Sequence, residues 1–237
     1  MTGLLTVGVL GGMGPAATVD FMGKLIAATG AAREQDNLRL LVDCNPHVPD
    51  RNTASIEGVH PGPVIAEMAK GLERQGANFI VMACNTAHAY EADIRAALGV
   101  PFVSLIAESA QVLAKRHPNV KRAGLLAGTG CLEARLYQEA LAARGVEAVL
   151  LDHTGQTRFM TLLYQIKRGD TSSAARAEMR SLADELIASG ADVVMAACTE
   201  VPLVLSAGDI AVPLLDTTQV LVERTLAYAR DGEPLPA

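Results

Sequence analysis

Residues Met82–His88, MACNTAH, place a cysteine just after an apolar run, and residues Met195–Pro202, MAACTEVP, do the same. Each run opens with Gly-Ala, and Cys84 and Cys198 stand at the same distance from that dipeptide. A short apolar run bounded by glycine is typical of a buried strand in a parallel sheet. The sequence therefore predicts that two similar strands each deliver a thiol to a similar turn. We expect the two thiols to face each other across one small-molecule site.

A second pair of segments repeats in the same order. Val7–Gly14, VGVLGGMG, resembles Ala123–Gly130, AGLLAGTG, at nearly the offset that separates the two cysteine strands. Chance similarity between glycine turns is the alternative, but two landmarks at nearly one offset favour a duplication into two similar lobes. The period is far too long for a solenoid. Because ligands bind beyond the carboxyl ends of strands in open α/β sheets, a pseudo-twofold axis would bring both cysteines to one site.

Apolar runs alternate with segments of helical periodicity along the chain, which predicts parallel sheets with helices on both faces. We expect strands at residues 6–10, 38–44, 79–83, 101–105, 122–127, 146–150, 192–197 and 212–215, and helices at 18–28, 64–75, 86–98, 107–116, 131–144, 155–168, 173–189 and 217–229. The expected fold class is α/β, with two pseudo-symmetric lobes, each a mostly parallel sheet flanked by helices, and an active site between them. We assign residues 1–98 and 213–237 to the first lobe and residues 99–212 to the second.

The composition excludes several classes of partner. Half of the 237 residues are hydrophobic and only 3% are aromatic, so a large aliphatic core can form. The low aromatic content and the net charge of −6 argue against nucleic acid. No apolar run approaches about 18 residues, and the N-terminal stretch lacks the basic segment of a signal peptide, so we expect no membrane partner. The expected location is the cytoplasm, where thiols stay reduced.

The four cysteines lie far apart and form no C-x-x-C pair. The spacing typical of zinc ligands is missing, so we predict no metal site, and we do not expect disulfides. A free cysteine is usually a small buried hydrophobe, which is our interpretation of Cys44 and Cys131. The polar residues Thr199 and Glu200 after Cys198 favour a reactive role there, and Cys84 has similar neighbours.

A cysteine at a strand-to-helix turn can become reactive, because backbone N–H groups of the following helix favour the thiolate. Asn85 and Thr86 after Cys84 add polar side chains at that turn. A racemase removes a proton from one face of a carbon atom and returns one to the other face, so it needs two acid–base groups. Two symmetric thiols suit this chemistry.

Several motifs together resemble the aspartate/glutamate racemase family, the cofactor-independent amino-acid racemases. They are GGMGPAAT, CNTAH, CTE followed by Pro202, PDR at Pro49–Arg51, LYQIKRG at Leu163–Gly169 and PLLDTTQVL, and the similarity covers essentially the whole chain. The resemblance implies two α/β lobes, a homodimer, and no pyridoxal phosphate or other cofactor. It also implies that Cys84 and Cys198 are the catalytic acid and base.

The resemblance assigns substrate-binding residues as well. Arg51 and Lys167 match the cations that hold the substrate's carboxylates, Arg as a bidentate fork and Lys as a point charge. The other positions that match the lining of the site are Met13, Asn85, Thr86, Thr199 and Glu200. Backbone N–H groups at the glycine turn and the helix N-termini would stabilise the charge of a carbanion. Without the resemblance, Arg51 would be interpreted as an exposed loop arginine and Lys167 as an ordinary helix-end lysine.

The predicted function is racemisation of an amino acid, with aspartate or glutamate as the first choice. The alternatives are a broad-specificity amino-acid racemase and a thiol-dependent isomerase or decarboxylase of the same superfamily. Departures from the family pattern at Gly128, Cys131, Ala134 and Ala197 leave the substrate open. Residues 12–17 also satisfy the G-x-G-x-x-A pattern of nicotinamide-binding folds, but that reading leaves the repeated cysteine strands unexplained. A two-lobed binding protein without activity is the non-enzyme alternative.

Overall fold

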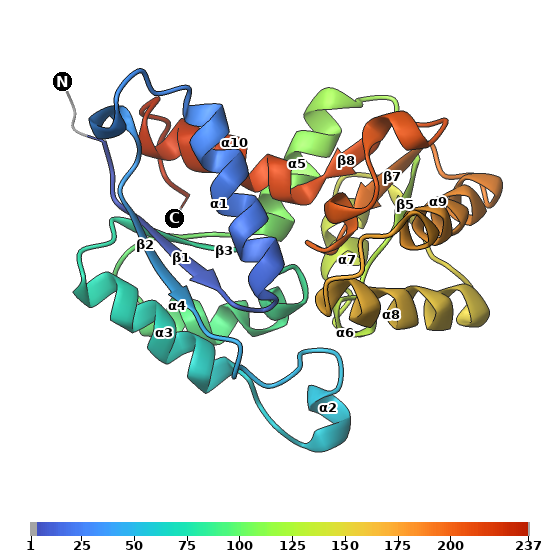
Figure 1. Ribbon diagram of the computed structural model, residues 1–237, viewed down its shortest axis with the longest axis horizontal. Coiled ribbons are helices and arrows are strands. Elements are labelled where there is room, and N and C mark those ends of the chain that lie inside the picture. Colours follow the sequence, from blue (N-terminus) through green and yellow to red (C-terminus); the bar gives the residue numbers. More distant parts are fainter. Residues whose placement is uncertain (1–3, 237) are drawn as a thin grey trace.

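Two four-stranded sheets, one in each of two lobes that lie side by side, organise the part of the chain that the computed structural model describes, residues 4–236 (Figure 1). The first sheet has the order β2-β1-β3-β4, the second has the order β6-β5-β7-β8, and every pair is parallel. The strands are β1 (Val7–Gly11), β2 (Leu40–Cys44), β3 (Phe79–Met82), β4 (Phe102–Val103), β5 (Arg122–Leu125), β6 (Glu147–Val149), β7 (Val193–Ala196) and β8 (Leu214–Asp216).

Helices cover both faces of each sheet. The α-helices are α1 (Pro15–Thr29), α2 (Ala54–Glu57), α3 (Gly62–Arg74), α4 (Glu91–Ala97), α5 (Leu105–Arg116), α6 (Thr129–Glu133), α7 (Leu136–Ala142), α8 (His153–Lys167), α9 (Ser173–Ala188) and α10 (Thr217–Ala229). Short 3₁₀ helices are η1 (Glu34–Asp36), η2 (Thr86–Tyr90), η3 (Val201–Leu203) and η4 (Ala207–Asp209). The predicted fold class, two α/β lobes of parallel strands flanked by helices, is confirmed.

The cores follow from the alternation of side chains along each strand. In the first lobe, Val7 and Val9 pack against α1 and α10, whereas Leu10 packs against α3. In the second lobe, Val194 packs against α8 and α9, whereas Met195 packs on the side of α5 and α7. Because successive residues of a strand point to opposite faces, an entirely apolar strand fills two cores at once. This is why the central strands β3 and β7 are uninterrupted apolar runs.

The repeated segments occupy equivalent places in the two lobes. Gly8 in β1 and Gly124 in β5 each lie beneath a helix. A Cβ atom on Gly8 would collide with Ile80 and lie 3.2 Å from Leu72 of α3, and a Cβ on Gly124 would lie 2.9 Å from Leu186 of α9. Glycine is therefore required at the same position of both repeats, because it lets one helix pack closely on the sheet. This shared requirement supports the duplication.

The expected lobe boundaries differ from the observed strand pairing at two places. We expected residues 99–212 to form the second lobe, but β4 pairs with β3 in the first sheet. We expected residues 213–237 to return to the first lobe, but β8 pairs with β7 in the second sheet. In both cases the strand completes one sheet and the helix that follows, α5 or α10, carries the chain across to the other lobe. Each edge strand was assigned to the wrong side because the expected boundary was placed before it.

Two expected helices differ in detail. The helix expected at residues 131–144 breaks between α6 and α7, where Arg135 has a φ of 53°. The helix expected at residues 86–98 begins as the 3₁₀ helix η2 and continues as α4. The last helix has the expected bounds, and the Asp216 carboxylate caps it by accepting from the N–H groups of Thr218 and Gln219. Such a cap contributes about 1 kcal/mol.

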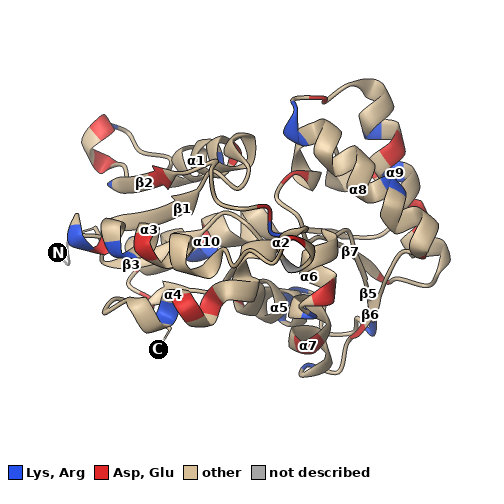
Figure 2. Cartoon of the chain, turned by 90° about the horizontal axis from the view of Figure 1, so that it is seen from below, with Lys and Arg blue, Asp and Glu red and all other residues tan. Residues whose placement is uncertain are grey.

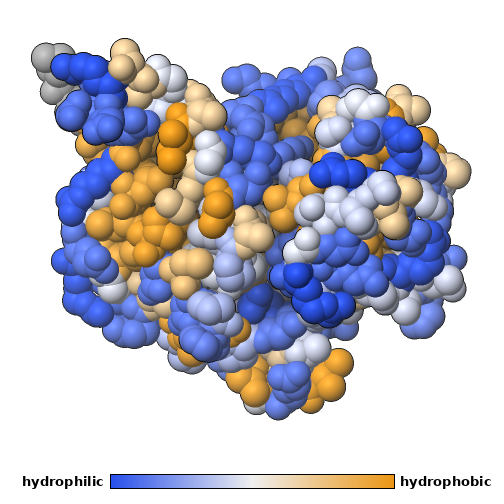
Figure 3. Space-filling model, viewed as in Figure 1, coloured by the Kyte–Doolittle hydropathy of each residue, from blue (hydrophilic) through white to orange (hydrophobic). Residues whose placement is uncertain are grey.

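The surface is mixed in character. Charged residues are spread over the outer helices of both lobes (Figure 2). Hydrophobic residues gather on the first lobe and on the projecting segment around α2 (Figure 3), where Ile56 is 83% exposed. Between residues 4 and 236, no helix is both long enough and apolar enough to cross a bilayer.

Candidate active site

The two cysteines that the sequence singles out lie at equivalent turns. Cys84 follows β3 and precedes η2, and Cys198 follows β7 and precedes η3. Both are free thiols, 5% and 7% exposed, respectively. Burial of a polarisable thiol behind a strand end is compatible with a simple core residue, so the neighbours of each sulfur decide its role.

Lys167, at the end of α8, links the two thiols. Its ammonium group interacts electrostatically with both Cys198 and Cys84, and with the carboxylate of Glu200. Burial opposes the charge of Lys167, but these partners, Glu200 first among them, outweigh it and raise its pKa. The partly buried ammonium group of Lys167 is therefore within electrostatic range of both sulfurs.

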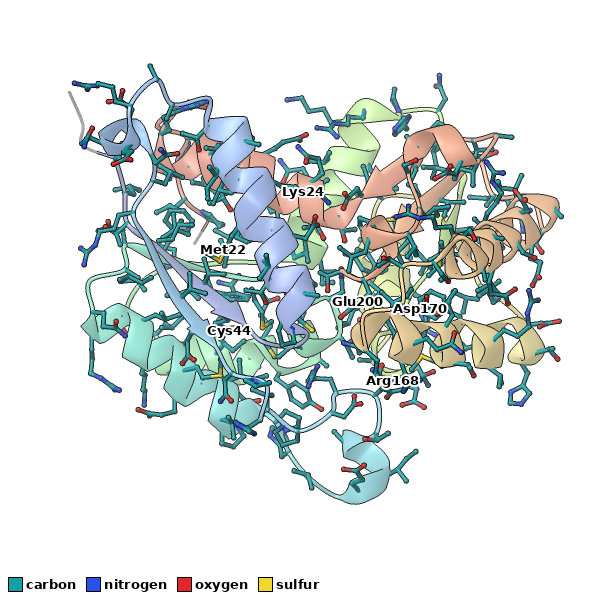
Figure 4. The ribbon with its side chains drawn as sticks, in the orientation of Figure 1. Met22, Lys24, Cys44, Arg168, Asp170 and Glu200 are labelled. Carbon is teal, nitrogen blue, oxygen red and sulfur yellow. The ribbon has the colours of Figure 1, made fainter. Side chains whose placement is uncertain are left out.

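Among the second-lobe residues at the candidate site, Glu200 forms a network of hydrogen bonds. Its Oε1 accepts a hydrogen bond from Lys167 Nζ at 2.7 Å, and its Oε2 accepts from Cys198 Sγ at 3.1 Å and from Thr199 Oγ1 at 3.2 Å. The carboxylate is almost fully buried, and Figure 4 shows it between the two lobes. Burial and the charge of Glu200 raise the pKa of Cys198 well above its usual value, although Lys167 acts in the opposite direction. Cys198 is therefore harder to ionise than an ordinary cysteine.

The first lobe contributes the loop after β2 and the turn after β1. The guanidinium group of Arg51 donates to the backbone carbonyl oxygens of Val48, Pro49 and Met13 at 3.1, 2.9 and 2.9 Å. Its Nε is buried and has no hydrogen-bond partner. Lys167 Nζ also approaches the Met13 carbonyl, at 3.4 Å. The cations from the two lobes thus meet at one carbonyl oxygen, and one buried donor of Arg51 is left without a partner.

The N-terminus of α1 approaches the same charges. A Cβ atom on Gly14, the N-cap of α1, would lie 3.2 Å from Glu200 Oε1 and 3.6 Å from Lys167 Nζ. The side chain of Met13 is buried in the first-lobe core, so its contribution here is its carbonyl. A small residue at position 14 keeps the helix N-terminus close to the ion pair.

A hydrogen-bonded network joins the two cysteine turns. Asn85, next to Cys84, accepts from the Tyr137 hydroxyl at 2.5 Å and donates to Thr217 Oγ1 at 3.3 Å. Thr217 in turn donates to the carbonyl of Ala196, two residues before Cys198, at 2.7 Å. All of these side chains are buried. Asn85 therefore fixes the register between the turns, a role that its sequence position did not reveal.

Thr86 meets the glycine turn of the second lobe. A Cβ atom on Gly130 would lie 3.0 Å from the Thr86 methyl group and would collide with the Arg51 carbonyl oxygen. The Gly130 N–H donates to Asn52 Oδ1 at 3.2 Å. The second repeat's glycines thus allow the first-lobe loop to pack tightly onto the start of α6.

Tyr137, Asn52 and Asp50 are residues near the site that sequence reasoning missed. The Tyr164 hydroxyl donates to Asp50 Oδ2 at 2.8 Å and so ties the first-lobe loop to α8. Burial opposes the charge of Asp50, but hydrogen bonds from the Asn52 N–H and from Tyr164 outweigh it and lower its pKa. The position of Asp50 inside PDR was the available signal, whereas no sequence pattern marked Tyr137.

His88, Cys131 and Cys44 do not belong to the proposed reacting groups. His88 Nε2 accepts from the Leu105 N–H at 3.0 Å, so Nδ1 carries the proton and donates to the Cys84 carbonyl at 2.8 Å. His88 therefore supports the backbone of the turn. Cys131 is fully buried, and burial raises its pKa to about 12, which fits the expected core residue. Cys44 is exposed at the end of β2, in contrast to the expected buried hydrophobe (Figure 4).

No cluster of three potential metal ligands of the His, Cys, Asp or Glu type occurs among the described residues.

Comparison with known proteins identifies the family. The family model for Asp/Glu/Hydantoin racemase matches residues 10–225. A broad specificity amino-acid racemase, RacX of Bacillus subtilis, is 30% identical over 227 residues, which cover 93% of this chain and 96% of RacX. The structure of the Picrophilus torridus aspartate racemase aligns with a TM-score of 0.86 at 30% identity and covers 98% of this chain and 96% of that one.

A more distant structure, glutamate racemase from Campylobacter jejuni, shares the fold with a TM-score of 0.66 at 17% identity, over 98% of this chain and 88% of that one. The two-lobed arrangement thus extends well beyond the relatives of similar sequence. The chain belongs to the Asp/Glu/Hydantoin racemase family, which confirms the resemblance drawn from its motifs and the enzyme class, an amino-acid racemase, that they predict.

Proposed function

We propose that this protein racemises aspartate or glutamate without a cofactor, by a two-base mechanism in which Cys84 and Cys198 act from opposite faces of the α-carbon. The observation that carries the proposal is that two buried thiols follow equivalent strands and that their turns are joined through Asn85 and Thr217. One thiolate removes the α-proton and the other thiol donates a proton to the opposite face. The first sulfur then holds the proton and the second is the thiolate.

The substrate assignment rests on the cations. Removal of an α-proton leaves charge on the carboxylate, and the unpartnered Nε of Arg51 offers a buried donor for an anionic oxygen. The similarity to an aspartate racemase supports an acidic substrate. Met13, Asn85, Thr86, Thr199 and Glu200 are proposed to shape the site around it.

A broad-specificity amino-acid racemase is the second candidate, and the similarity to RacX favours it. Lys167 is already paired with Glu200, so the site holds less free positive charge than its two cations suggest. Only Arg51 then distinguishes acidic from neutral side chains. A homodimeric, cytoplasmic enzyme stays our prediction for the assembly and its location.

The test is α-proton exchange in deuterated water over a panel of L- and D-amino acids. We expect deuterium at the α-carbon together with inversion, fastest for aspartate or glutamate. Comparable rates across neutral amino acids would establish the broad-specificity alternative, and exchange with none of them would refute racemisation. Turnover of a maleate-like or malonate-like acid in its place would point to the isomerase or decarboxylase alternative.

The two-base mechanism has its own test. Cys84→Ala and Cys198→Ala should each abolish inversion, because each removes one of the two proton carriers. Cys44→Ala is the matched control, since that thiol lies at the exposed end of β2. Full activity in either of the first two variants would contradict the mechanism.

A further inference from the structure

The two thiols have unequal surroundings, although their turns are equivalent. Cys198 Sγ donates a hydrogen bond to a carboxylate oxygen of Glu200 at 3.1 Å. Among the hydrogen bonds of residues 4–236, none joins Cys84 Sγ to a carboxylate. The residue two positions after Cys84, where Glu200 stands after Cys198, is Thr86, and Asn85 between them bonds to Tyr137 and Thr217. The two turns therefore have equivalent places in the backbone, but the side chains that follow each cysteine differ.

Hydrogen bonds hold both carboxylate oxygens of Glu200. Its Oε1 is held by Lys167 Nζ at 2.7 Å, which leaves Oε2 directed at Cys198 and Thr199. The side chain of Glu200 is 3% exposed, so water does not screen its charge effectively. A carboxylate in this position accepts a hydrogen bond from the thiol but repels a thiolate.

The other groups that act on Cys198 do not cancel this preference. The titratable groups around it are Glu200 from its own turn, Lys167 from α8, Tyr137 from α7 and, across the proposed site, Cys84. Lys167 favours the thiolate, but its ammonium bonds to the far oxygen of Glu200 and is largely neutralised there. Tyr137 is buried, and burial raises its pKa, so it stays neutral. The balance favours a protonated Cys198, in agreement with the direction of its pKa.

We propose that Glu200 is a positioning residue that holds the proton on Cys198 in the resting enzyme, so that Cys198 is the resting acid and Cys84 the resting base. The assignment of acid and base rests on the proposed racemase function. One turnover moves a proton from the α-carbon to Cys84 and another from Cys198 to the opposite face. The enzyme is then left with a thiolate beside Glu200, and proton exchange with water returns it to the resting form.

Alkylation of individual thiols by iodoacetamide over a range of pH tests this assignment without any substrate. Thiolate is the reacting form, and peptide mass spectrometry reads each cysteine separately. The pH at which the alkylation rate of a cysteine reaches half its maximum is called its midpoint. In the wild-type protein we expect the midpoint of Cys198 to lie above the pKa of about 8.5 of an ordinary cysteine. In Glu200→Gln the negative charge is lost and Lys167 is released, so the midpoint of Cys198 should fall by about one pH unit or more, a tenfold rise in thiolate at a given pH below it.

Lys167→Met is a second variant, and it should shift the midpoint of Cys198 in the opposite direction. It leaves the Glu200 carboxylate without its cation, so the midpoint of Cys198 should rise. A structural disturbance alone would not move the midpoint in opposite directions in the two variants, and Lys167→Met carries the test if Glu200→Gln does not fold. Glu178→Gln is the matched control, because Glu178 pairs with Arg158 on the outer face of the second lobe and should leave Cys198 unchanged.

A midpoint of Cys198 at or below that of an ordinary cysteine, or one that Glu200→Gln leaves unmoved, would overturn the proposal. The α-proton exchange experiment fails or succeeds independently. Absence of exchange with a raised Cys198 midpoint would refute the racemase function while the proton assignment stands. Exchange with an ordinary Cys198 midpoint would refute Glu200 as the proton-holding residue while the racemase function stands.

Discussion

Arg51 is positioned by backbone carbonyl groups and not by a carboxylate. Three carbonyl oxygens hold its terminal nitrogens, and its Nε stays buried without a partner. An unsatisfied buried donor costs about 1–3 kcal/mol, and a ligand oxygen would recover that cost. Lys167 differs, because Glu200 already neutralises it. Recognition of a substrate carboxylate therefore depends more on Arg51 than on Lys167.

Arg51→Lys should weaken the binding of acidic amino acids. A lysine cannot reproduce the planar fork or the Nε donor, and a charge-assisted hydrogen bond is worth about 1.5–3 kcal/mol, so we expect KM for aspartate or glutamate to rise by about tenfold to a hundredfold. Steady-state kinetics with acidic and neutral substrates provide the measurement. Arg158→Lys, on the outer side of α8, is the control. An equal rise for neutral amino acids would contradict a side-chain role for Arg51.

The 3₁₀ helix η2 is tied to the start of α5 by a single imidazole. His88 bridges the Cys84 carbonyl and the Leu105 N–H, so it joins the first thiol turn to the crossing from β4 into the second lobe. Its Nε2 lone pair is used as an acceptor, and protonation would remove that bond. Burial also lowers the pKa of His88, since the charged form is poorly solvated there.

Stability should therefore fall on acidification. The pKa of His88 is lower in the folded chain than its usual value of about 6.5 in the unfolded chain, so the unfolded chain binds this proton first as pH drops. The loss is absent well above pH 6.5 and grows by about 1.4 kcal/mol for each pH unit below it, until the folded state is protonated too. Urea unfolding at neutral and mildly acidic pH measures it. His88→Gln keeps a donor and an acceptor but does not titrate, and should reduce this slope, whereas His153→Gln at the exposed start of α8 should retain it.

Helices α5 and α10 pack against each other and so hold the two lobes together. Glu108 of α5 accepts from Arg224 Nε at 2.7 Å and from the Tyr228 hydroxyl at 2.6 Å, and the side chains of Glu108 and Arg224 are 7% and 18% exposed. A second ion pair, Arg116 with Glu223, joins the same two helices on the surface. The two pairs differ mainly in burial, so they provide a direct comparison.

Arg224→Leu should destabilise the protein strongly, because it leaves the Glu108 carboxylate buried without its cation. Removing one member of a buried ion pair costs about 3–5 kcal/mol, whereas an exposed pair contributes about 0–1 kcal/mol. Arg116→Leu should therefore change little. Urea denaturation of both variants gives the two free energies of unfolding. Similar losses in the two variants would show that the buried pair is not the fastening contact.

The sequence predicted features that depend on neighbouring residues. The bounds of α10 follow from the Asp216 cap and the helical spacing after it, and the strands follow from apolar runs that end at Gly, Pro or Cys. The break at Arg135 and the pairing of β4 and β8 depend on contacts with distant segments, which local patterns do not record. The same holds within the site. The motif CTE brought Glu200 to attention, but its hydrogen bond to Cys198 and its ion pair with Lys167 became visible only in three dimensions.

The chain crosses between the lobes twice, once after β4 and once after β8. A gene fragment that stops after β4 would encode all four strands of the first sheet but would omit α10, whose apolar side chains cover one face of it. The complementary fragment would contain α10 but not the first sheet, against which most of its apolar side chains pack. Neither fragment is therefore an independent folding unit. We expect the two fragments to be soluble only when they are co-expressed in one cell.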